Sequence, residues 1–258
     1  MKKTNSLTFA QIVANTLIGE SAAMKKLRAE LVILAAGKSN ILISGETGTG
    51  KEIAATLIAG SISDEGDIIN VNCALLKGPL SDSELFGHMK GSFSGADYTR
   101  RGLVELAHGK VLFLDEVEEL ESSTQAKLLR FMENGEYRRL GSGEMRYSKC
   151  RVIAATNEKV KVLFSKDKLR KDFFMRVSTQ VLRVPPLRER LEDIPLLIAF
   201  KEKLMKAERH ISDFSLFFEY NWPGNVRELF HVVERIHATC SEELLVTPEL
   251  INPLLLDI

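Results

Sequence analysis

Cysteine is scarce in this sequence, and the few cysteines present are far apart. The chain of 258 residues has Cys73, Cys150 and Cys240, an odd number with no CxxC pair. Such a set cannot form a disulfide framework, and it lacks the paired spacing of a structural zinc site. We therefore expect reduced, buried thiols, as in a cytosolic protein.

Net charge and long apolar runs are also absent. The 35 basic and 35 acidic residues cancel, which argues against a protein whose main task is to wrap nucleic acid but allows a local basic patch. No apolar run has the length of a membrane span. Met1-Lys2-Lys3 is followed by polar residues instead of an apolar signal segment. We expect a soluble, intracellular protein that does not contact membranes.

Short apolar runs alternate with longer helical patterns, which is typical of an α/β protein with a parallel sheet. The apolarity within each run is continuous, so we expect strands that are covered on both faces. The predicted strands are residues 40–44, 68–72, 111–115, 150–156 and 179–184.

The strand signal ends at Pro185-Pro186, and helical patterns follow. We therefore predict an α/β domain over residues 1–185 and a small α-helical domain over 186–258. The predicted helical segments of the second domain are 194–209, 214–220 and 226–239.

Three positions in the first domain indicate where helices begin and end. Ser81 with Glu84, and Ser122 with Gln125, have the spacing of capping boxes. Gly135 stands where a helix would end in a glycine cap.

The segment "GETGTGKE" (Gly45 to Glu52) follows the strongest predicted strand and precedes a helical pattern. This is the setting of a phosphate-binding loop, in which backbone N–H groups contact phosphates and Lys51 neutralises their charge. Glu52 stands where the general pattern has a hydroxyl that holds magnesium. The alternative interpretation is a glycine turn that happens to contain a lysine.

Polar residues end two further predicted strands. Asp115 and Glu116 follow "VLFL", and this pair suits a magnesium-holding aspartate and a glutamate that polarises the attacking water. Thr156 and Asn157 end the next predicted strand and could sense a γ-phosphate. Solvated acids in the first case, and ordinary turn residues in the second, are the alternatives.

Three arginines are candidates for contacts with nucleotide phosphate. Arg227, in "WPGNVREL", begins a helix against the helix dipole and has no carboxylate at helical spacing, so we expect it to bind an external anion. Arg170 and Arg176 could reach a neighbouring subunit's nucleotide as arginine fingers. A plain surface arginine is the alternative for Arg227. Local ion pairs with Asp167 and Asp172 are the alternative for the other two.

Taken together, these segments resemble the AAA+ ATPase module of bacterial sigma-54-dependent transcription activators, the enhancer-binding proteins. The resemblance covers nearly the whole chain from Ile18 to the C-terminus. The segments that carry it are "LIGES", "GETGTGKE", "VNCALL", "SELFGHMKGSFSGA", "VLFLDE", "QAKLLRFMENGEYRRLG", "AATN", "LRKDFFMRV", "VPPLRERLEDIPLL" and "WPGNVREL".

The resemblance implies an α/β AAA+ P-loop NTPase fold with a parallel sheet flanked by helices and a small helical lid. It also implies a hexameric ring that binds ATP and Mg²⁺ between its subunits. Asp115 would hold the Mg²⁺ and Glu116 would be the catalytic glutamate, restrained by Asn72. Arg170 and Arg176 would act in trans. The nucleotide-binding residues it implies are Ile18, Gly19, Gly45, Glu46, Thr47, Gly48, Thr49, Gly50, Lys51, Glu52, Thr156, Asn157 and Arg227. Glutamate is common in this family at the position of Glu52.

The stretch "GSFSGA" lies on the family's GAFTGA loop, which projects from the ring and contacts the sigma factor. Ser92 replaces alanine and Ser94 replaces threonine, while Phe93 and both glycines are present. The resemblance therefore implies that Gly91, Ser92, Phe93, Ser94, Gly95 and Ala96 bind sigma-54.

The sequence-based hypothesis is a cytoplasmic bacterial ATPase that remodels RNA polymerase bearing sigma-54. We expect no receiver domain and no helix-turn-helix in this chain, and we expect any promoter DNA contact to be indirect or to go through a partner or another domain. The first alternative is a co-regulator that binds ATP and forms homo- or hetero-oligomers without contacting sigma-54. The second is a remodelling ATPase of the chaperone or protease type.

Overall fold

The computed structural model describes residues 7–61, 68–165, 168–239 and 246–251. The chain forms two compact units. Unit 1 comprises Met1–Ala29, Glu46–Gly50 and Val184–Ile258, and unit 2 comprises Glu30–Gly45 and Lys51–Arg183. The lid therefore belongs to the same unit as the first 29 residues and the middle of the glycine-rich loop.

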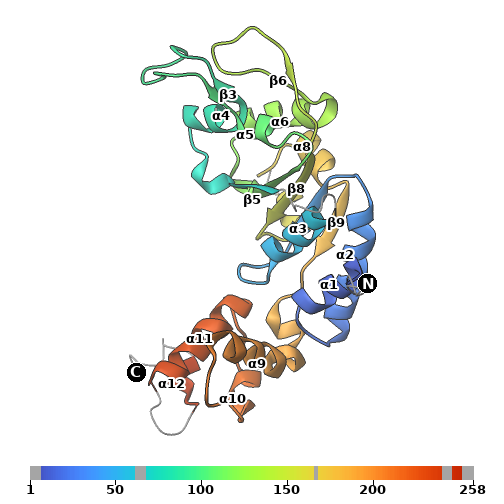
Figure 1. Ribbon diagram of the computed structural model, residues 1–258, viewed down its shortest axis with the longest axis vertical. Helices are drawn as coiled ribbons and strands as arrows, with labels where there is room; N and C mark the ends of the chain where they lie inside the picture. The colour runs from blue at the N-terminus through green and yellow to red at the C-terminus, as the bar shows by residue number, and fades with distance from the viewer. Residues whose placement is uncertain (1–6, 62–67, 166–167, 240–245, 252–258) are drawn as a thin grey trace, which may run out of the picture. The chain divides into compact units, whose positions relative to one another are not determined.

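Unit 2 is built on a parallel five-stranded sheet with the order β2-β5-β8-β1-β9 in the described part of the chain (Figure 1). The strand bounds lie within one residue of the predicted ones. The strands are β1 (Ile41–Ser44), β2 (Ile68–Asn72), β5 (Val111–Asp115), β8 (Arg151–Thr156) and β9 (Gln180–Arg183).

The burial of each strand follows its place in the sheet. All residues of β1 and β8 are buried, and β5 is buried up to its last residue. The edge strands β2 and β9 keep exposed or partly exposed residues. Continuous apolar segments therefore form the central strands, because both of their faces are covered.

Helices and short turns of unit 2 pack around this sheet. They are the later part of α2 (Ala22–Ala36), α3 (Lys51–Gly60), η1 (Cys73–Leu75), α4 (Pro79–Phe86), α5 (Leu103–Leu106), η2 (Val117–Glu119), α6 (Ser122–Asn134), α7 (Val160–Ser165) and α8 (Lys171–Val177). Two small antiparallel ladders project from this body. They pair β3 (Gly87–His88) with β4 (Arg100–Arg101), and β6 (Glu136–Tyr137) with β7 (Arg146–Tyr147).

The helix-end predictions are confirmed in one case and wrong in two. Gly135 ends α6 with a φ of 74°, as a glycine cap does. Ser81 instead lies inside α4, where its buried hydroxyl bonds the Thr124 hydroxyl at 2.9 Å. Gln125 does not cap α6, because its side chain holds the chain before α8 by accepting from the Arg170 N–H at 2.8 Å.

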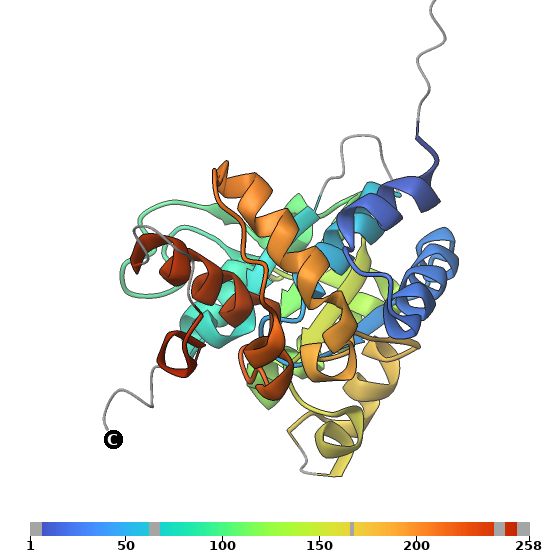
Figure 2. The ribbon, with the colours of Figure 1, turned by 90° about the horizontal axis from the view of Figure 1, so that it is seen from below.

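In unit 1 the lid comprises η3 (Leu187–Glu189), η4 (Leu191–Asp193), α9 (Ile194–Met205), α10 (Ser215–Glu219), α11 (Asn225–Thr239) and α12 (Pro248–Ile251). These helices are coloured orange to red in Figures 1 and 2. Trp222 is fully buried among them and stacks on Phe217 with ring centroids 5.8 Å apart. Helix α9 ends before the predicted residue 209, because Lys206 takes the left-handed conformation. Helix α1 (Phe9–Thr16) also belongs to unit 1.

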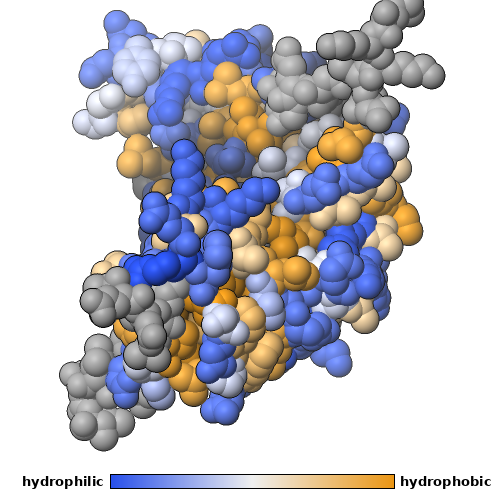
Figure 3. Space-filling view, turned by 60° about the horizontal axis from the view of Figure 1, so that its bottom comes forward, coloured by the Kyte–Doolittle hydropathy of each residue, from blue (hydrophilic) through white to orange (hydrophobic). Residues whose placement is uncertain are grey.

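Cys73 is buried and Cys150 is partly buried, and neither forms a disulfide. Cys240 lies outside the described residues. Within the described ranges, no helix is both long enough and apolar enough to cross a membrane. Hydrophilic and hydrophobic residues are intermixed on the face shown in Figure 3.

A charged network anchors the β6–β7 hairpin to α5. The Glu105 carboxylate accepts from Arg139 Nη2 at 2.7 Å and from the Tyr137 hydroxyl at 3.0 Å. Burial alone would raise the pKa of Glu105, but these hydrogen bonds and the charge of Arg139 hold that pKa below its ordinary value. The stabilisation is therefore present above the ordinary glutamate pKa and is lost as the pH falls through the folded-state value.

We expect Glu105→Gln to lower the free energy of unfolding by about 1–3 kcal/mol at neutral pH, because the Arg139 and Tyr137 donors lose a charged acceptor. The difference should shrink at an acid pH below the lowered folded-state pKa, where the wild-type carboxyl is also protonated. Urea denaturation at both pH values measures it. Glu144→Gln, which removes an exposed partner of Arg146, is the matched control. An equal difference at both pH values would contradict the role of the charge.

Candidate nucleotide site and partner loop

Lys51 and Glu116 are linked in unit 2 through one amide side chain. The Lys51 ammonium donates to Asn157 Oδ1 at 2.6 Å and to the Gly45 carbonyl at 2.8 Å. Asn157 Nδ2 in turn donates to Glu116 Oε1 at 3.3 Å. The carboxyl ends of β1, β5 and β8 thus bring together three residues that the sequence places far apart.

The carboxylate pair at the end of β5 has an unusual backbone. Glu116 has a φ of 53°, in the left-handed region that non-glycine residues rarely adopt. Its N–H donates to Asp115 Oδ1 at 3.0 Å. Such strained positions gather at functional sites.

Burial, followed by the nearby negative charge of Asp115, Glu118 and Glu116, raises the pKa of Cys73 and keeps that thiol protonated.

Thr156 and Asn157 differ in what their side chains do. The Thr156 side chain is fully buried and accepts from the Glu158 N–H at 3.0 Å, which is the ordinary turn contact. Asn157 faces Lys51 and Glu116, and its own N–H donates to Glu118 Oε1 at 3.0 Å. Sequence reasoning missed Glu118, because nothing in the acidic run after β5 marks it as the acceptor.

Asn72 does not make the predicted contact in this conformation. It lies beside Asp115 in the β2–β5 register, but its Oδ1 accepts from the Ala74 N–H at 2.9 Å and caps η1. Among the described hydrogen bonds, the amide on Glu116 comes from Asn157 instead.

Unit 1 holds the middle of the glycine-rich loop against the first turn of α11. The Gly48 carbonyl accepts from the N–H groups of Val226 at 3.1 Å and Arg227 at 3.4 Å. Gly48 has a φ of 77°, and a Cβ there would lie 2.2 Å from the Gly224 carbonyl oxygen. Position 48 therefore requires glycine, because of its positive φ and because a side chain would collide with the Gly224 carbonyl.

Side chains of the lid fix the rest of this loop. Arg188 forms an ion pair with Glu46, with Nη1 2.6 Å from Oε2. The buried Arg190 donates to the Thr49 carbonyl at 3.3 Å, and Asn225 Nδ2 donates to the Thr47 carbonyl at 3.0 Å. Sequence reasoning did not assign these lid residues to the loop, because their pairing is long-range and carries no fixed spacing.

The remaining loop residues form a turn that leads into α3. The Thr49 hydroxyl donates to the Glu46 carbonyl at 2.7 Å, and Gly50 has a φ of 104°. Glu52 is exposed in the first turn of α3. Successive N–H groups that lead into a helix form a typical phosphate cradle.

Arg227 is exposed on the first turn of α11, and its guanidinium has no partner within the described part of the chain. Its backbone is nevertheless fixed by the bond to the Gly48 carbonyl. An arginine that is anchored at its backbone and unpaired at its tip is available to an anion.

Ile18 and Gly19 belong to a tightly held turn of unit 1. Arg28 Nη1 donates to the Gly19 carbonyl at 2.5 Å. Asp193 accepts from the N–H groups of Glu20 at 2.7 Å and Ser21 at 2.8 Å. A Cβ on Gly19 would lie 2.5 Å from Asp193 Oδ2, so this turn requires glycine.

The donor set of Asp115 and Glu116 is compatible with Mg²⁺. This ion takes oxygen ligands, keeps several waters, and needs only one or two carboxylates beside nucleotide phosphates. No group of three or more His, Cys, Asp or Glu residues that could hold a metal occurs within the described ranges. Two adjacent carboxylates thus fit an ion whose other ligands are waters and nucleotide phosphates.

The two predicted arginine fingers have different partners. Arg170 pairs with Asp172, with Nη2 2.7 Å from Oδ2, and its hydrogen bond to this carboxylate raises the pKa of the guanidinium. From the sequence, Asp172 was expected to pair with Arg176 instead of Arg170. Asp167, the other expected partner, lies outside the described residues.

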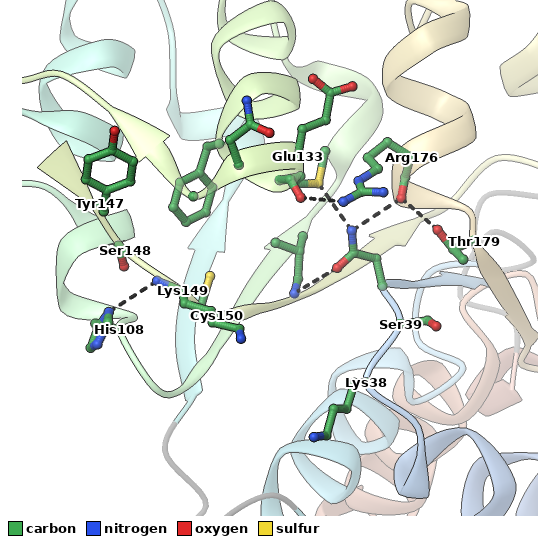
Figure 4. A pocket seen from close by; sticks show the side chains of 16 residues that line it. Lys38, Ser39, His108, Glu133, Tyr147, Ser148, Lys149, Cys150, Arg176 and Thr179 are labelled. Atoms are coloured by element: carbon green, nitrogen blue, oxygen red, sulfur yellow. Dashed lines mark hydrogen bonds between the residues drawn. The ribbon is translucent and has the colours of Figure 1, made fainter. Parts of the chain in front are cut away.

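Arg176 lines a cavity of about 680 Å³ at the amino ends of the strands (Figure 4). Its Nη2 donates to the Met132 carbonyl at 2.7 Å. Lys38, Lys149 and His108 line the same cavity. Lys51 lies at the opposite edge of the sheet, and strands of four to six residues separate the two edges by about 13–20 Å.

Phe93 is only partly exposed. Its ring lies edge-on against the buried His88, with centroids 5.1 Å apart. The loop is closed by the Gly91 N–H, which donates to the Ala96 carbonyl at 2.8 Å. Gly91 and Gly95 have φ values of 81° and 96°, and an added Cβ at either position would meet no other atom within 4 Å. Glycine is therefore favoured there by the backbone conformation and not by a lack of space. The sequence predicted an apolar tip presented to a partner, whereas this conformation shelters the ring.

The two serines that depart from the family pattern have different surroundings. Ser94 is exposed, while the Ser92 hydroxyl is buried without a hydrogen-bond partner within the described residues. Ser92 packs on Gly141 of the β6–β7 hairpin, where an added Cβ would approach Ser92 Cβ to 2.6 Å.

Comparison with known proteins extends this geometry. The "Sigma-54 interaction domain" family matches residues 17–183, more than half of the chain, and the "AAA+ ATPase lid domain" family matches residues 188–256. The anaerobic nitric oxide reductase transcription regulator NorR of Serratia proteamaculans is 41% identical over 227 residues, which are 85% of this chain and 45% of the relative. The transcriptional regulatory protein ZraR of Escherichia coli is 38% identical over 242 residues, 91% of this chain and 55% of the relative. The chain thus spans about half the length of these curated relatives.

Solved structures share the fold of this chain. NtrX from Brucella abortus in complex with ATP matches with a TM-score of 0.83 and 32% identity, over 93% of this chain and 55% of that one. The Saccharomyces cerevisiae Hsp104–casein complex, at 20% identity and a TM-score of 0.60, shares the fold alone. The chain belongs to the sigma-54 interaction domain family and has the AAA+ fold with its lid domain.

Proposed function

We propose that this chain hydrolyses ATP and uses the reaction to remodel RNA polymerase bound to sigma-54 through the loop around Phe93. The observation that carries the proposal is the Lys51–Asn157–Glu116 chain of hydrogen bonds, since it joins a phosphate-binding cation to a carboxylate in a family of sigma-54 interaction domains. The ATP complex of NtrX supports the nucleotide.

Each group of residues has a task in binding. Lys51 and the N–H groups of residues 46–50 contact the phosphates, because a cation and aligned N–H dipoles favour the anion. Arg227 supplies a second cation for the phosphates. The Ile18–Gly19 turn receives the adenine. Each side chain acts from a backbone that the surrounding hydrogen bonds hold in place.

In the reaction, the oxygen of a water attacks the γ-phosphorus, the bond to the bridging oxygen breaks, and ADP leaves. Glu116 accepts the proton of that water. Asp115 would hold the Mg²⁺, which would neutralise part of the phosphate charge. Asn157 orients Glu116 through its amide. When phosphate binds, it replaces Asn157 as the acceptor of the Lys51 ammonium.

Arg176 acts on a neighbouring subunit in this proposal, which requires a ring of identical or mixed subunits. Because Arg176 lies at the edge of the sheet opposite to Lys51, it does not reach the phosphate that its own Lys51 binds. Arg170 is the second candidate and must leave Asp172 to act.

Mixing two inactive variants tests the action in trans. We expect Arg176→Ala subunits and Lys51→Ala subunits to regain part of the ATPase activity when combined, since some interfaces then contain one intact lysine and one intact arginine. Phosphate release across a series of mixing ratios measures the recovery. Absence of recovery at every ratio would assign Arg176 a structural role through Met132.

A second candidate function is a co-regulator that binds ATP and oligomerises without engaging sigma-54. The sheltered position of Phe93 favours it. An assay of ATP-dependent open-complex formation with sigma-54 polymerase separates the two. Open complexes that form with ATP support the activator, whereas ATP hydrolysis without open complexes supports the co-regulator.

A further inference from the structure

A groove of about 380 Å³ lies between α6 and the β6–β7 hairpin of unit 2. We call it the hairpin groove. Four cationic side chains line it: Lys127, Arg130, Arg138 and Arg139. The single carboxylate that faces them from the groove wall is Glu136.

Two of these cations are already neutralised within unit 2. Lys127 forms an ion pair with Asp82, and Arg139 forms one with Glu105 at 2.7 Å. Arg130 and Arg138 are exposed and have no hydrogen-bond or ion-pair partner within the described part of the chain. The groove therefore presents two guanidinium groups that can form bidentate bonds with carboxylates.

The other side chains of the groove are apolar or aromatic. Phe86, Tyr137 and Leu140 line it, and Met145 is exposed at its rim with 38% of its surface accessible. Methionine and aromatic rings adapt to apolar side chains of varied shape. A nucleic-acid backbone offers charge but no apolar group for this lining, whereas a peptide offers both.

The hairpin groove is joined directly to the base of the Phe93 loop. The Leu140 N–H donates to the Gly87 carbonyl at 2.9 Å, and the Met89 N–H donates to the Leu140 carbonyl at 3.0 Å. Leu140 thus belongs to the groove and also pairs with the segment that leads into the loop. A partner that contacts Phe93 lies next to this groove.

We propose that the hairpin groove binds a short acidic segment with an apolar residue, carried by the same sigma factor that the Phe93 loop engages. The segment's carboxylates pair with Arg130 and Arg138, and its apolar side chain contacts Tyr137, Leu140 and Met145. This inference rests on the proposed function and adds a second point of contact to it. Two adjacent contacts on one partner raise the affinity above that of the loop alone.

The test compares the full chain with Arg130→Glu/Arg138→Glu by fluorescence anisotropy of labelled sigma-54 in the presence of ATP. Like charges facing each other in an interface are strongly unfavourable, so we expect sigma-54 binding at least about tenfold weaker. ATP hydrolysis should stay unchanged, because neither arginine contacts the nucleotide residues. Met145→Ser should weaken binding as well, since it removes apolar contact without altering charge.

The matched control is Lys161→Glu/Lys203→Glu, which makes the same change in charge at two exposed lysines elsewhere and should bind like wild type. If wild type binds sigma-54 and the arginine variant binds it equally well, the groove is not a contact and the proposed function stands. If wild type fails to bind at all, the proposed function fails. If the arginine variant binds promoter DNA more weakly but binds sigma-54 with unchanged affinity, the groove binds nucleic acid and the proposed peptide contact is wrong.

Discussion

Glu116→Gln is expected to lower the steady-state rate of ATP hydrolysis at least about a hundredfold while ATP still binds, since proton transfer by a positioned side chain contributes about 10²–10⁴-fold. Glutamine keeps the size of the side chain and the Oε1 that accepts from Asn157, but it cannot take a proton from water. The expected effect is therefore on turnover. Phosphate release and binding of a fluorescent ATP analogue measure the two properties separately.

Glu119→Gln provides the control for this variant. Glu119 lies three residues further along the same acidic turn and is exposed, so its replacement removes one negative charge nearby without touching Asn157. Wild-type turnover is expected. Several turnovers per minute by Glu116→Gln, as by the Glu119→Gln control, would show that Glu116 is not the proton acceptor.

Phe93→Ala should abolish open-complex formation with sigma-54 polymerase and leave ATP hydrolysis within about twofold of wild type. An aromatic residue at the centre of an interface contributes about 2–4 kcal/mol, which is about 30- to 1,000-fold in affinity. The ring must leave His88 to reach a partner, and the lost edge-on contact costs about 0.5–1.5 kcal/mol. Open complexes and phosphate release are measured on the same preparations.

An exposed phenylalanine elsewhere gives the comparison. Phe218 on α10 keeps 43% of its surface accessible, so Phe218→Ala removes the same ring from a site with no proposed contact. It should support open complexes at the wild-type rate. Equal activity of Phe93→Ala in that assay would show that the loop does not transmit the effect of hydrolysis through this ring.

The sheet was predictable because the residues of its central strands form continuous apolar runs in the sequence. Residues 111–115 form β5 with the predicted bounds, and Asp115 and Glu116 stand at its carboxyl end as expected. The glycine-rich loop was predictable for a similar reason, since its glycines and Lys51 have a fixed spacing in one short segment.

Side-chain partners were less predictable, because local spacing does not reveal a long-range acceptor. Gln125 has the spacing of a capping residue, yet its amide bonds the chain before α8. Asn72 was expected on Glu116, while Asn157, expected only to sense phosphate, makes that contact. The lid residues that hold the glycine-rich loop were missed because their pairing depends on the tertiary fold.

The Asn157 amide has a consequence for how binding and catalysis are coupled. Its oxygen bonds Lys51 and its nitrogen bonds Glu116, so a phosphate that competes for the lysine removes one of the bonds that fix the amide. Coupling of this kind is reciprocal. Whatever draws Lys51 away from Asn157 loosens the restraint on Glu116, and whatever strengthens the bond to Glu116 weakens phosphate binding by the same free energy. One side chain can thus keep the proton acceptor restrained until a phosphate binds.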